Sequence, residues 1–529
     1  MKSVTLDHKW RIDTWSNLDQ NWDVIVIGGG ITGAGVLNMA AQKGLKVVLL
    51  EANDFAFGTS SRSSKLVHGG IRYLKNHQFD VVRESVKERE RLLKESNGLV
   101  DPLRFIFPSF EEYQNESKMM RLGIILYDLL APKWQHRSLN KTNVIKALPP
   151  LTQAHLLGGE EYCDARVDDS RLVLRIIKDG LRFGGYALNY AKVIGLCKSR
   201  IGQVEGVIVQ DQSGKLDPKV KELKGKVIIN ATGPWSDQVR QGVNGGPKLR
   251  PLRGSHLLFL HEKLPIRAAV TMLHPRDGRA LFAIPWENQT LIGTTDLDHE
   301  MKEDETRITQ FEVDYLLEAA QHSFNTNPVT QEDIISTFSG LRPVINTNAT
   351  TPSKESRAHQ IWEENGLISV AGGKLTIFRV MAADTLNFCQ ALLPGNPKFD
   401  HRSPCFISPQ TEKREALLDP QWIMMAGKLG KDVNEFFNES DADQLSSIES
   451  IPSLWAELNW AAKHEAVLHL DDLLLRRVRL GILLKNGGIA HLEKVKHLTS
   501  NALKWSNDQW KAEISRYKSI WQENYAIPK

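Results

Sequence analysis

The hydrophobic pattern near the start of the chain predicts a strand, a helix and a second strand in close succession. Residues 24–27 form an uninterrupted apolar run that ends in three glycines, which is typical of a strand buried on both faces. Small and apolar residues recur at helical spacing over 31–43, and the run LKVVLL at 45–50 indicates another buried strand. These segments together form a βαβ unit.

The rest of the chain divides into a β-rich middle and a helical end. Residues 80–95 predict a heavily charged helix with one apolar stripe, and residues 301–330 predict another helical stretch. After about residue 395, several prolines break the pattern and helices rich in Trp and Leu follow. The predicted strands are 203–210, 227–229 and the runs HLLFL, RALFAIPW, TLIGTTD and LISVAGG.

These changes in pattern suggest domain boundaries. We expect residues 1–20 to be a polar N-terminal extension and residues 21–395 to carry the main domain. A substrate cap, roughly 95–160 and 250–335, is expected to interleave with that domain, and residues 400–529 to form a helical C-terminal domain.

Composition and charge exclude several classes of protein. The 529 residues are 41% hydrophobic and 25% charged, as in ordinary folded chains, and the net charge of +4 predicts no polyanion-binding surface and no nucleic-acid partner. The four cysteines lie far apart, which argues against a zinc site or a disulfide framework and fits a reducing compartment. The N-terminus lacks the apolar core of a signal peptide, and no apolar run approaches the roughly 18 residues that a membrane span needs.

The turn after the first strand carries a dinucleotide signature. In GGGITGAG, Gly28 permits the tight turn, Gly30 lets the backbone approach a pyrophosphate, and Gly33 lets helix and strand pack closely. Glu51 ends the second strand, where a carboxylate can bond a ribose hydroxyl. The motif alone suits NAD or FAD. Its N-terminal place and the late return of the chain at 372–373 favour the longer FAD.

Several longer motifs resemble one family. The stretches VIGGGITGAG, TSSRSSKLVHGGIRYL, CDARVDDSRLVL, NATGPWSDQV, LRGSHLLF, IPWENQTLIGTTD, FSGLRPV and SVAGGKLTIFR, with a weaker match in HLDDLLLRRVRLG, resemble the FAD-dependent glycerol-3-phosphate dehydrogenases of the respiratory, quinone-linked type. The resemblance implies an α/β fold: a Rossmann-like FAD-binding domain of the glutathione-reductase or amino-acid-oxidase type, a β-rich substrate cap and an α-helical C-terminal domain. The family's usual GGKLTTYR reads GGKLTIFR here, so Ile377 and Phe378 replace a hydroxyl pair.

The resemblance also implies a reaction and its partners. A hydride would pass from C2 of sn-glycerol 3-phosphate to N5 of the flavin, giving dihydroxyacetone phosphate, and the electrons would go to a quinone. We therefore expect a cytoplasmic protein with peripheral contact to the inner face of the membrane. Whether the chain forms a homodimer is an open question at this point. The alternatives are an oxidase that uses oxygen, an amine or amino-acid oxidase on the same scaffold, and a flavin-binding protein without turnover.

The matched motifs nominate residues for the substrate. Arg72 and Arg342 are expected to hold the phosphate, because a guanidinium meets phosphate oxygens bidentately, and Tyr73 can donate a hydroxyl. The general base is sought among His256, ranked first, His68 and Lys374.

The cofactor would contact a second set of residues. A hydroxyl-rich loop follows Glu51, and two strand-end turns return to the same place. Asp296 is a further candidate near the substrate. The residues expected at the cofactor are Gly28, Gly30, Gly33, Glu51, Thr59, Ser60, Ser61, Thr232, Gly233, Gly373, Lys374 and Thr376, and no metal ligands are expected.

Two segments have the composition of a helix at a membrane surface. Residues 118–134 combine eight large apolar residues with basic residues at the ends and finish in a Trp. Residues 470–485 place basic residues beside seven leucines. Both segments are equally compatible with burial against neighbouring helices.

Overall fold

The first sheet is mainly parallel and is buried on both faces. The computed structural model describes residues 4–71, 78–130, 135–301, 306–350, 355, 358–409 and 418–528. The sheet runs in the order β17-β18-β10-β1-β2-β7, and β8 and β9 extend it through β10. Its strands are β1 (Asn21–Ile27), β2 (Val47–Leu50), β7 (Tyr186–Leu188), β8 (Ala191–Lys198), β9 (Val204–Asp211), β10 (Val220–Asn230), β17 (His359–Glu364) and β18 (Leu367–Gly372).

The continuous apolar run of β1 is explained by two cores. Val24 and Val26 pack into one hydrophobic cluster with α2 (Ile31–Gln42), whereas Ile25 and Ile27 face a second cluster on the opposite side. Successive side chains of a strand point to opposite faces, so a strand covered on both sides must be apolar at every position. The predicted βαβ unit is confirmed, with β1 parallel to β2.

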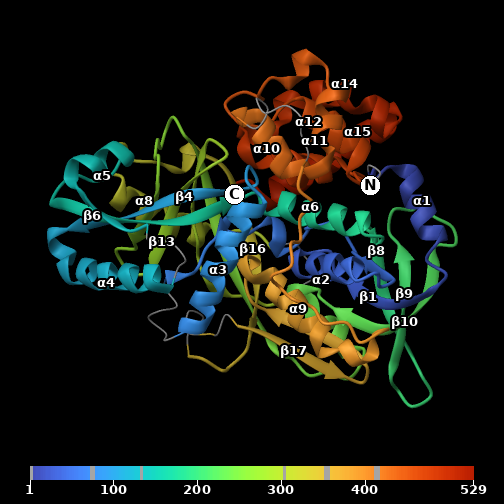
Figure 1. Cartoon of the computed structure of the whole chain (residues 1–529). Coiled ribbons are helices and arrows are strands. Elements are labelled where there is room, and N and C mark those ends of the chain that lie inside the picture. The colour runs from blue at the N-terminus through green and yellow to red at the C-terminus, as the bar shows by residue number, and fades with distance from the viewer. Residues whose placement is uncertain are drawn as a thin grey trace.

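The second sheet is long and mostly antiparallel, and it stands beside the first. The path is β15-β11-β14-β13-β12-β4-β6-β3, with β16 paired to β11 and β5 to β6. Its strands are β3 (Leu66–Val67), β4 (Val100–Phe110), β5 (Arg137–Asn140), β6 (Leu156–Val167), β11 (Leu249–Leu260), β12 (Ala269–Leu273), β13 (Ala280–Trp286), β14 (Gln289–Gly293), β15 (Leu297–Asp298) and β16 (Ile334–Ile345). Figure 1 shows this sheet on the left, with α4 (Gln114–Leu130), α5 (Lys141–Ala147) and α8 (Gln310–Ser323) beside it.

The helices include the charged one expected at 80–95, which is α3. Among the described residues of the stretch 301–330, the helix is α8. The longer helices are α1 (His8–Ser16), α2 (Ile31–Gln42), α3 (Phe79–Glu95), α4 (Gln114–Leu130), α5 (Lys141–Ala147), α6 (Asp169–Arg182), α7 (Ser236–Gln241), α8 (Gln310–Ser323), α9 (Phe378–Phe388), α10 (Pro420–Leu429), α11 (Val433–Glu439), α12 (Ala456–His464), α13 (Leu480–Leu483), α14 (Leu492–Leu503) and α15 (Asn507–Asn524). Among the described residues, no helix has the length and apolarity to cross a membrane.

The first twenty residues are not only a polar extension. Helix α1 buries Trp15 in the second core of the parallel sheet, and the Trp15 indole donates to Pro218 O at 3.1 Å. Arg11 is also buried and donates to Asn189 O at 2.8 Å. Because these partners lie about two hundred residues away, the polar local composition hides the helix's role.

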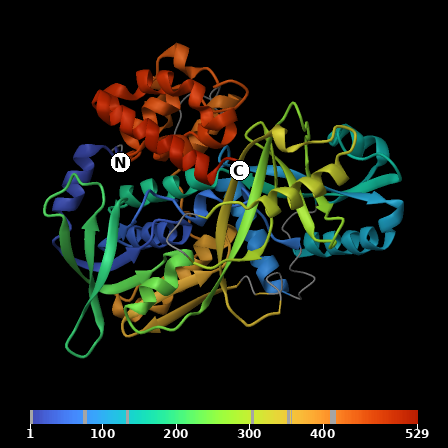
Figure 2. The ribbon, with the colours of Figure 1, turned by 180° about the vertical axis from the view of Figure 1, so that it is seen from behind.

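The C-terminal helices cover both sheets. They lie above α6 in Figure 1, and their leucines share a core with Trp286 and Phe338 of the second sheet. In Figure 2 both chain ends lie at the junction with these helices. There the N–H of Leu6 donates to His464 O at 3.2 Å, and the N–H of Thr337 donates to Tyr525 O at 2.7 Å. The expected helical end of the chain is confirmed; the expected domain boundaries stay predictions.

Candidate active site

The turn between β1 and α2 is too tight for any side chain. A Cβ on Gly33 would lie 2.0 Å from Gly28 O, and one on Gly28, whose φ is +109°, would lie 2.6 Å from Ala231 O. Gly30 caps α2 without a side chain, so the positive end of the helix stays open. The N–H of Ile31 donates to the Ser60 hydroxyl at 3.0 Å. The turn therefore offers backbone donors and a helix N-terminus to an anion.

Glu51 ends β2 beside this turn. Its carboxylate accepts the N–H groups of Gly29 at 2.6 Å and Asn53 at 2.8 Å. Burial raises the pKa of Glu51, and the two backbone hydrogen bonds oppose that shift. The side chain is thus fixed at the end of the strand, where a ribose hydroxyl would lie.

A cavity of about 2050 Å³ extends from this turn to the second sheet. It brings together most of the residues that the sequence nominates. Those that line it are Gly28, Gly30, Glu51, Thr59, Ser60, His68, Thr232, Gly233, His256, Asp296, Arg342, Gly373, Lys374 and Thr376.

Among the described residues, two nominated ones do not line the cavity. Gly33 lies behind the turn and serves packing, as its contact with Gly28 shows. Ser61 is buried behind the lining, where its hydroxyl donates to Phe57 O and Gly58 O at 3.3 and 3.4 Å, and its contact with the cofactor stays a prediction. Arg72 and Tyr73 lie outside the described residues.

The hydroxyl-rich loop connects the two sheets. Thr59 donates to Leu341 O of β16 at 2.5 Å, directly before Arg342. Ser63 donates to Asp169 at 2.7 Å. The Ser64 hydroxyl lies 2.9 Å from His256 Nε2. The loop therefore positions residues of the second sheet over the dinucleotide turn.

His256 is a buried histidine on β11 that is held in one orientation. Its ring stacks on Phe338 with centroids 4.7 Å apart, and only 2% of the residue is exposed. Nδ1 is buried and has no hydrogen-bond partner among the residues that the structure describes. Burial lowers the pKa of His256 well below its usual value, and the cations Arg342 and Lys65 lower it further. The imidazole is therefore neutral at neutral pH and able to accept a proton.

A pair of arginines shares one carboxylate in the same cavity. Asp296 accepts from Arg342 Nη1 at 2.8 Å and pairs with Arg279 Nη2 at 3.2 Å. Arg342 also donates to the Thr294 hydroxyl at 3.0 Å. Both guanidinium groups are about one quarter exposed, so they reach the cavity while the carboxylate orients them. Two cations around one carboxylate leave a net positive charge that suits an anionic ligand.

The turn after β18 places a third cation there. Gly372 and Gly373 have φ of +81° and +70°, which glycine adopts readily. This turn directs the chain away from the end of β18 at Lys374. Lys374 Nζ donates to Gly69 O at 3.3 Å. The Thr376 hydroxyl accepts the N–H of His68 at 3.1 Å and donates to its carbonyl at 3.2 Å. Thr376 thus fixes the His68 backbone beside the glycine pair.

The turn after β10 is stabilised from within. Asn230 accepts the Thr232 hydroxyl at 2.7 Å and donates to the Ser236 hydroxyl at 3.0 Å. Gly233 follows with φ of +58°. The three strand-end turns of β1, β10 and β18 therefore meet at one edge of the parallel sheet, as parallel strands require.

Several residues at the cavity escaped sequence reasoning. Arg279 was missed because its neighbourhood, PRDGRA, looks like an ordinary surface turn. Lys65, which stands in a quoted motif, does not line the cavity itself: the structure buries it against Asp169 at 2.8 Å, and burial lowers its pKa to about 8. His469 and Arg516, from the C-terminal helices, also line the cavity. In the sequence, only the motif HLDDLLLRRVRLG indicated a functional role for the C-terminal helices.

The two segments with membrane-surface composition differ in the structure. In α4, Leu122 and Leu129 are each 68% exposed, whereas Ile124 and Tyr127 are buried. The interface reading of 470–485 is wrong, because its leucines lie in the core shared by the C-terminal helices and the second sheet. Residues 131–134 of the first segment are outside the described residues.

Comparisons with known sequences identify two matching families. The profile of the family described as FAD dependent oxidoreductase matches residues 23–377, and that of the C-terminal domain of alpha-glycerophosphate oxidase matches residues 419–510. An aerobic glycerol-3-phosphate dehydrogenase of Staphylococcus aureus is 34% identical over 487 residues, which cover 87% of each chain.

Solved structures agree with this result. A glycerol-3-phosphate dehydrogenase from Bacillus halodurans complexed with FAD is similar with a TM-score of 0.76 and 27% identity, over 98% of this chain and 97% of that one. An L-alpha-glycerophosphate oxidase from Mycoplasma pneumoniae with FAD bound has a TM-score of 0.58 and 17% identity, over 73% of this chain and 98% of that one. The second likeness concerns the fold alone.

Proposed function

The chain belongs to the family of FAD-dependent glycerol-3-phosphate dehydrogenases, whose cofactor it shares, and from this premise we propose that it oxidises sn-glycerol 3-phosphate to dihydroxyacetone phosphate and passes the electrons to a quinone. The observation that carries this proposal is one cavity that joins the dinucleotide turn, the Arg342–Arg279 pair and the neutral His256. An alcohol phosphate needs this combination: cations for the phosphate and a base for the hydroxyl.

The residues present fit FAD. Gly28 and Gly33 admit no Cβ, the N-terminus of α2 carries no side-chain cap, and Glu51 is fixed at the end of β2. These groups would hold the pyrophosphate and the adenosine ribose, and the turns at Thr232 and Gly373 would lie along the rest of the cofactor. When bound, the flavin supplies the acceptor for a hydride from the substrate.

Arg342 and Arg279 would bind the phosphate of the substrate. Their planar groups can each meet two phosphate oxygens, and Asp296 holds both in place. Lys374 adds a further positive charge near the same cavity. Arg72 and Tyr73 remain nominated by the sequence alone.

His256 would take the proton of the substrate hydroxyl. Its Nε2 is engaged by Ser64, its pKa lies well below the usual value, and its Nδ1 has no partner among the described residues, so the ring has capacity for one proton. The Ser64 contact and the Phe338 stacking hold the ring in one orientation at the cavity wall.

The quinone proposal is supported by α4. Met119, Met120 and Gly123 of this helix line the cavity together with Phe107 and Phe282. The outer side of the same helix exposes Leu122 and Leu129. Helix α4 thus both lines the cavity and presents exposed apolar residues, which suits a lipid-soluble acceptor at a membrane surface. A place at the cytoplasmic face of the membrane and a homodimer stay predictions.

Oxygen is the second candidate acceptor, because the C-terminal profile that matches belongs to an oxidase.

The test begins with anaerobic addition of sn-glycerol 3-phosphate to the purified yellow holoprotein, for which we expect bleaching of the flavin absorbance. Bleaching by an amino acid but not by this phosphate would contradict the substrate assignment. Reoxidation that is faster with a quinone analogue than with oxygen would support a dehydrogenase, and the reverse would favour an oxidase.

A further inference from the structure

The C-terminal helices contribute directly to the cavity. His469, Arg516 and Ile520 all line it, although the last strand of the parallel sheet ends at Gly372, more than ninety residues before them. Arg516 and Ile520 lie four residues apart on α15 and therefore share one helix face. None of these three residues belongs to the FAD-binding residues considered above, so they have no assigned role.

A chain of contacts connects His469 to Glu51. The ring of His469 meets that of Tyr190 edge-on, with centroids 5.1 Å apart. The N–H of Tyr190 donates to Asn53 O at 2.8 Å, and the N–H of Asn53 donates to the Glu51 carboxylate at 2.8 Å. Because Glu51 marks the ribose position, His469 lies at the adenosine end of the cavity.

Both polar side chains are held in place by carboxylates. His469 Nδ1 lies 2.9 Å from Glu513 Oε1, and the other oxygen of Glu513 accepts the N–H of Leu470 at 3.0 Å. Arg516 Nη2 pairs with Asp471 Oδ1 at 3.1 Å. The Nδ1 contact leaves Nε2 of His469 as the nitrogen that can meet a ligand.

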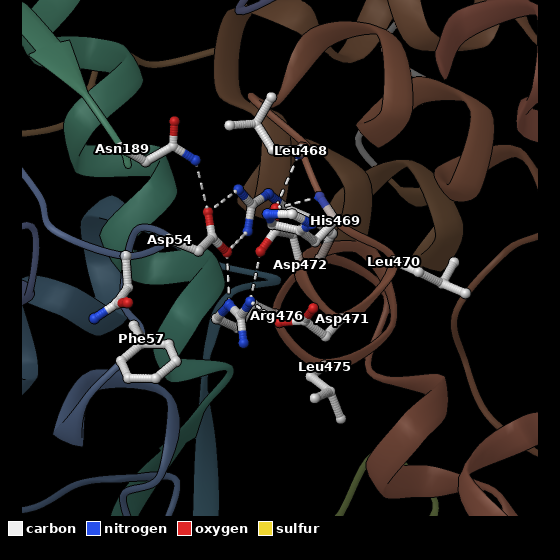
Figure 3. A network of polar contacts seen from close by, with 12 residues as sticks. Asp54, Phe57, Asn189, Leu468, His469, Leu470, Asp471, Asp472, Leu475 and Arg476 are labelled. Carbon is white, nitrogen blue, oxygen red and sulfur yellow. Dashed lines mark hydrogen bonds and ion pairs between the residues drawn. The ribbon is translucent and has the colours of Figure 1, made fainter. Parts of the chain in front are cut away.

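A buried ionic network locks this region to the turn after β2. Asp54, three residues beyond Glu51, accepts Arg476 Nε at 2.6 Å and Arg477 Nη1 at 2.7 Å. Asp472 accepts the Tyr190 hydroxyl at 2.6 Å and the N–H of His469 at 2.9 Å. Figure 3 shows Asp54 reaching across from one part of the chain to meet Arg476 of the other. The network therefore fixes His469 relative to the ribose-binding strand end.

We propose that the C-terminal helical region forms part of the binding site for the adenosine half of FAD, through His469, Arg516 and Ile520. This proposal rests on the cofactor of the proposed function but not on its substrate. A guanidinium stacks on aromatic faces, an imidazole donates or accepts a hydrogen bond, and an isoleucine covers an apolar ring face. These three properties together suit a purine nucleoside.

The test measures cofactor affinity rather than turnover. The apoproteins of wild type, His469→Ala and Arg516→Ala are titrated with FAD, with ADP and with FMN, and flavin fluorescence or calorimetry follows binding. Each variant is expected to bind FAD and ADP about tenfold more weakly, because each loses a hydrogen-bonding or stacking group. FMN lacks the adenosine half, so its affinity should stay unchanged.

Two matched variants on the same helical region serve as controls. Lys518→Ala removes an exposed cation of α15, and His491→Ala removes a histidine that pairs with Glu449 away from the cavity. Both should retain wild-type affinity for FAD. Unchanged FAD and ADP affinities in both cavity variants would overturn the proposal, and so would an equal loss of FMN affinity. A wild-type apoprotein that binds no FAD would overturn the cofactor assignment itself.

Discussion

At the scale of single residues, the position of His256 next to Arg342 has a chemical consequence. Burial, Arg342 and Lys65 all favour the neutral imidazole in the free protein. A phosphate bound to Arg342 would neutralise part of that positive charge, so the affinity of the ring for a proton would rise once substrate is present. The same arginine would thereby bind the substrate and strengthen the base.

The pH dependence of kcat/KM tests the state of His256. Because the pKa of His256 lies well below 6.5, the base should be neutral throughout neutral pH, and activity should fall only when the pH drops below that usual value. We expect a flat profile between about pH 7 and 8 and an acid limb below about pH 6.5. An acid limb centred at or above neutral pH would contradict this assignment.

Arg342→Ala tests the phosphate contact. Loss of two charge-assisted hydrogen bonds should raise KM for sn-glycerol 3-phosphate by about 100-fold, with a far smaller effect on glycerol. Steady-state kinetics with both substrates measure the difference. Arg276→Ala, which removes an exposed arginine paired with Glu318 outside the cavity, is the control. Equal losses for the two substrates would remove the assigned role.

At the scale of elements, the β1–α2 turn requires a residue without a side chain at Gly33. A Cβ there would lie 2.0 Å from Gly28 O, so Gly33→Ala should displace the helix from the strand and cost about 1–3 kcal/mol of folding stability. Lower FAD content and a lower melting temperature are expected. Gly246→Ala, where a Cβ meets nothing within 4 Å, should change neither. Normal FAD content in the Gly33 variant would contradict the role of the turn.

The ionic network joins the turn after β2 to the segment before α13. Burial alone would raise the pKa of Asp54, but Arg477 and Arg476 outweigh it and hold the pKa well below its usual range. The carboxylate therefore stabilises the fold above about pH 4, and that stability is lost as the pH falls through the low folded-state pKa.

Asp54→Asn removes the negative charge from this network. Two buried arginines would lose a shared counter-charge, so the variant should be less stable by about 3–5 kcal/mol at neutral pH. Thermal unfolding of the holoprotein measures the change, and the exposed Asp508→Asn serves as the control. A melting temperature equal to that of wild type would show that the network does not join the two regions.

The elements differ in how far local sequence decides them. The strands β1 and β2 could be predicted, because burial on both faces makes each position apolar. Helix α1 could not, because its buried Trp15 and Arg11 meet partners near 218 and 189 that no local pattern reveals. The segment 470–485 was ambiguous for the same reason: leucines beside arginines suit a membrane surface or a core whose ion pairs come from elsewhere.

At the scale of the whole molecule, the sequence predicted the part of the site on the parallel sheet better than the residues that other parts of the chain contribute to the cavity. Gly28, Glu51 and Gly373 sit at strand ends whose meeting point follows from parallel topology. Arg279 and His469 reach the cavity from the second sheet and the C-terminal helices. Their approach depends on how separate layers pack, which periodicity along the chain does not encode.

The exposed stripe on α4 gives a prediction about membrane contact. Leu122→Glu combined with Leu129→Glu places two charges on an apolar surface and should weaken binding to phospholipid vesicles, measured by sedimentation, by about 100-fold or more, since each buried leucine contributes roughly 1.5–3 kcal/mol. Ile201→Glu, at an 83% exposed residue outside the cavity, should leave vesicle binding unchanged. Equal binding of the α4 variant and wild type would contradict the interface assignment.

The central claim is that one cavity holds both FAD and a three-carbon phosphate. A crystal structure of the holoprotein with dihydroxyacetone phosphate tests it most directly. We expect the phosphate against Arg342 and Arg279, with the carbonyl oxygen near His256 and the flavin in the same cavity. A phosphate bound away from both arginines, or a cavity without flavin, would contradict it.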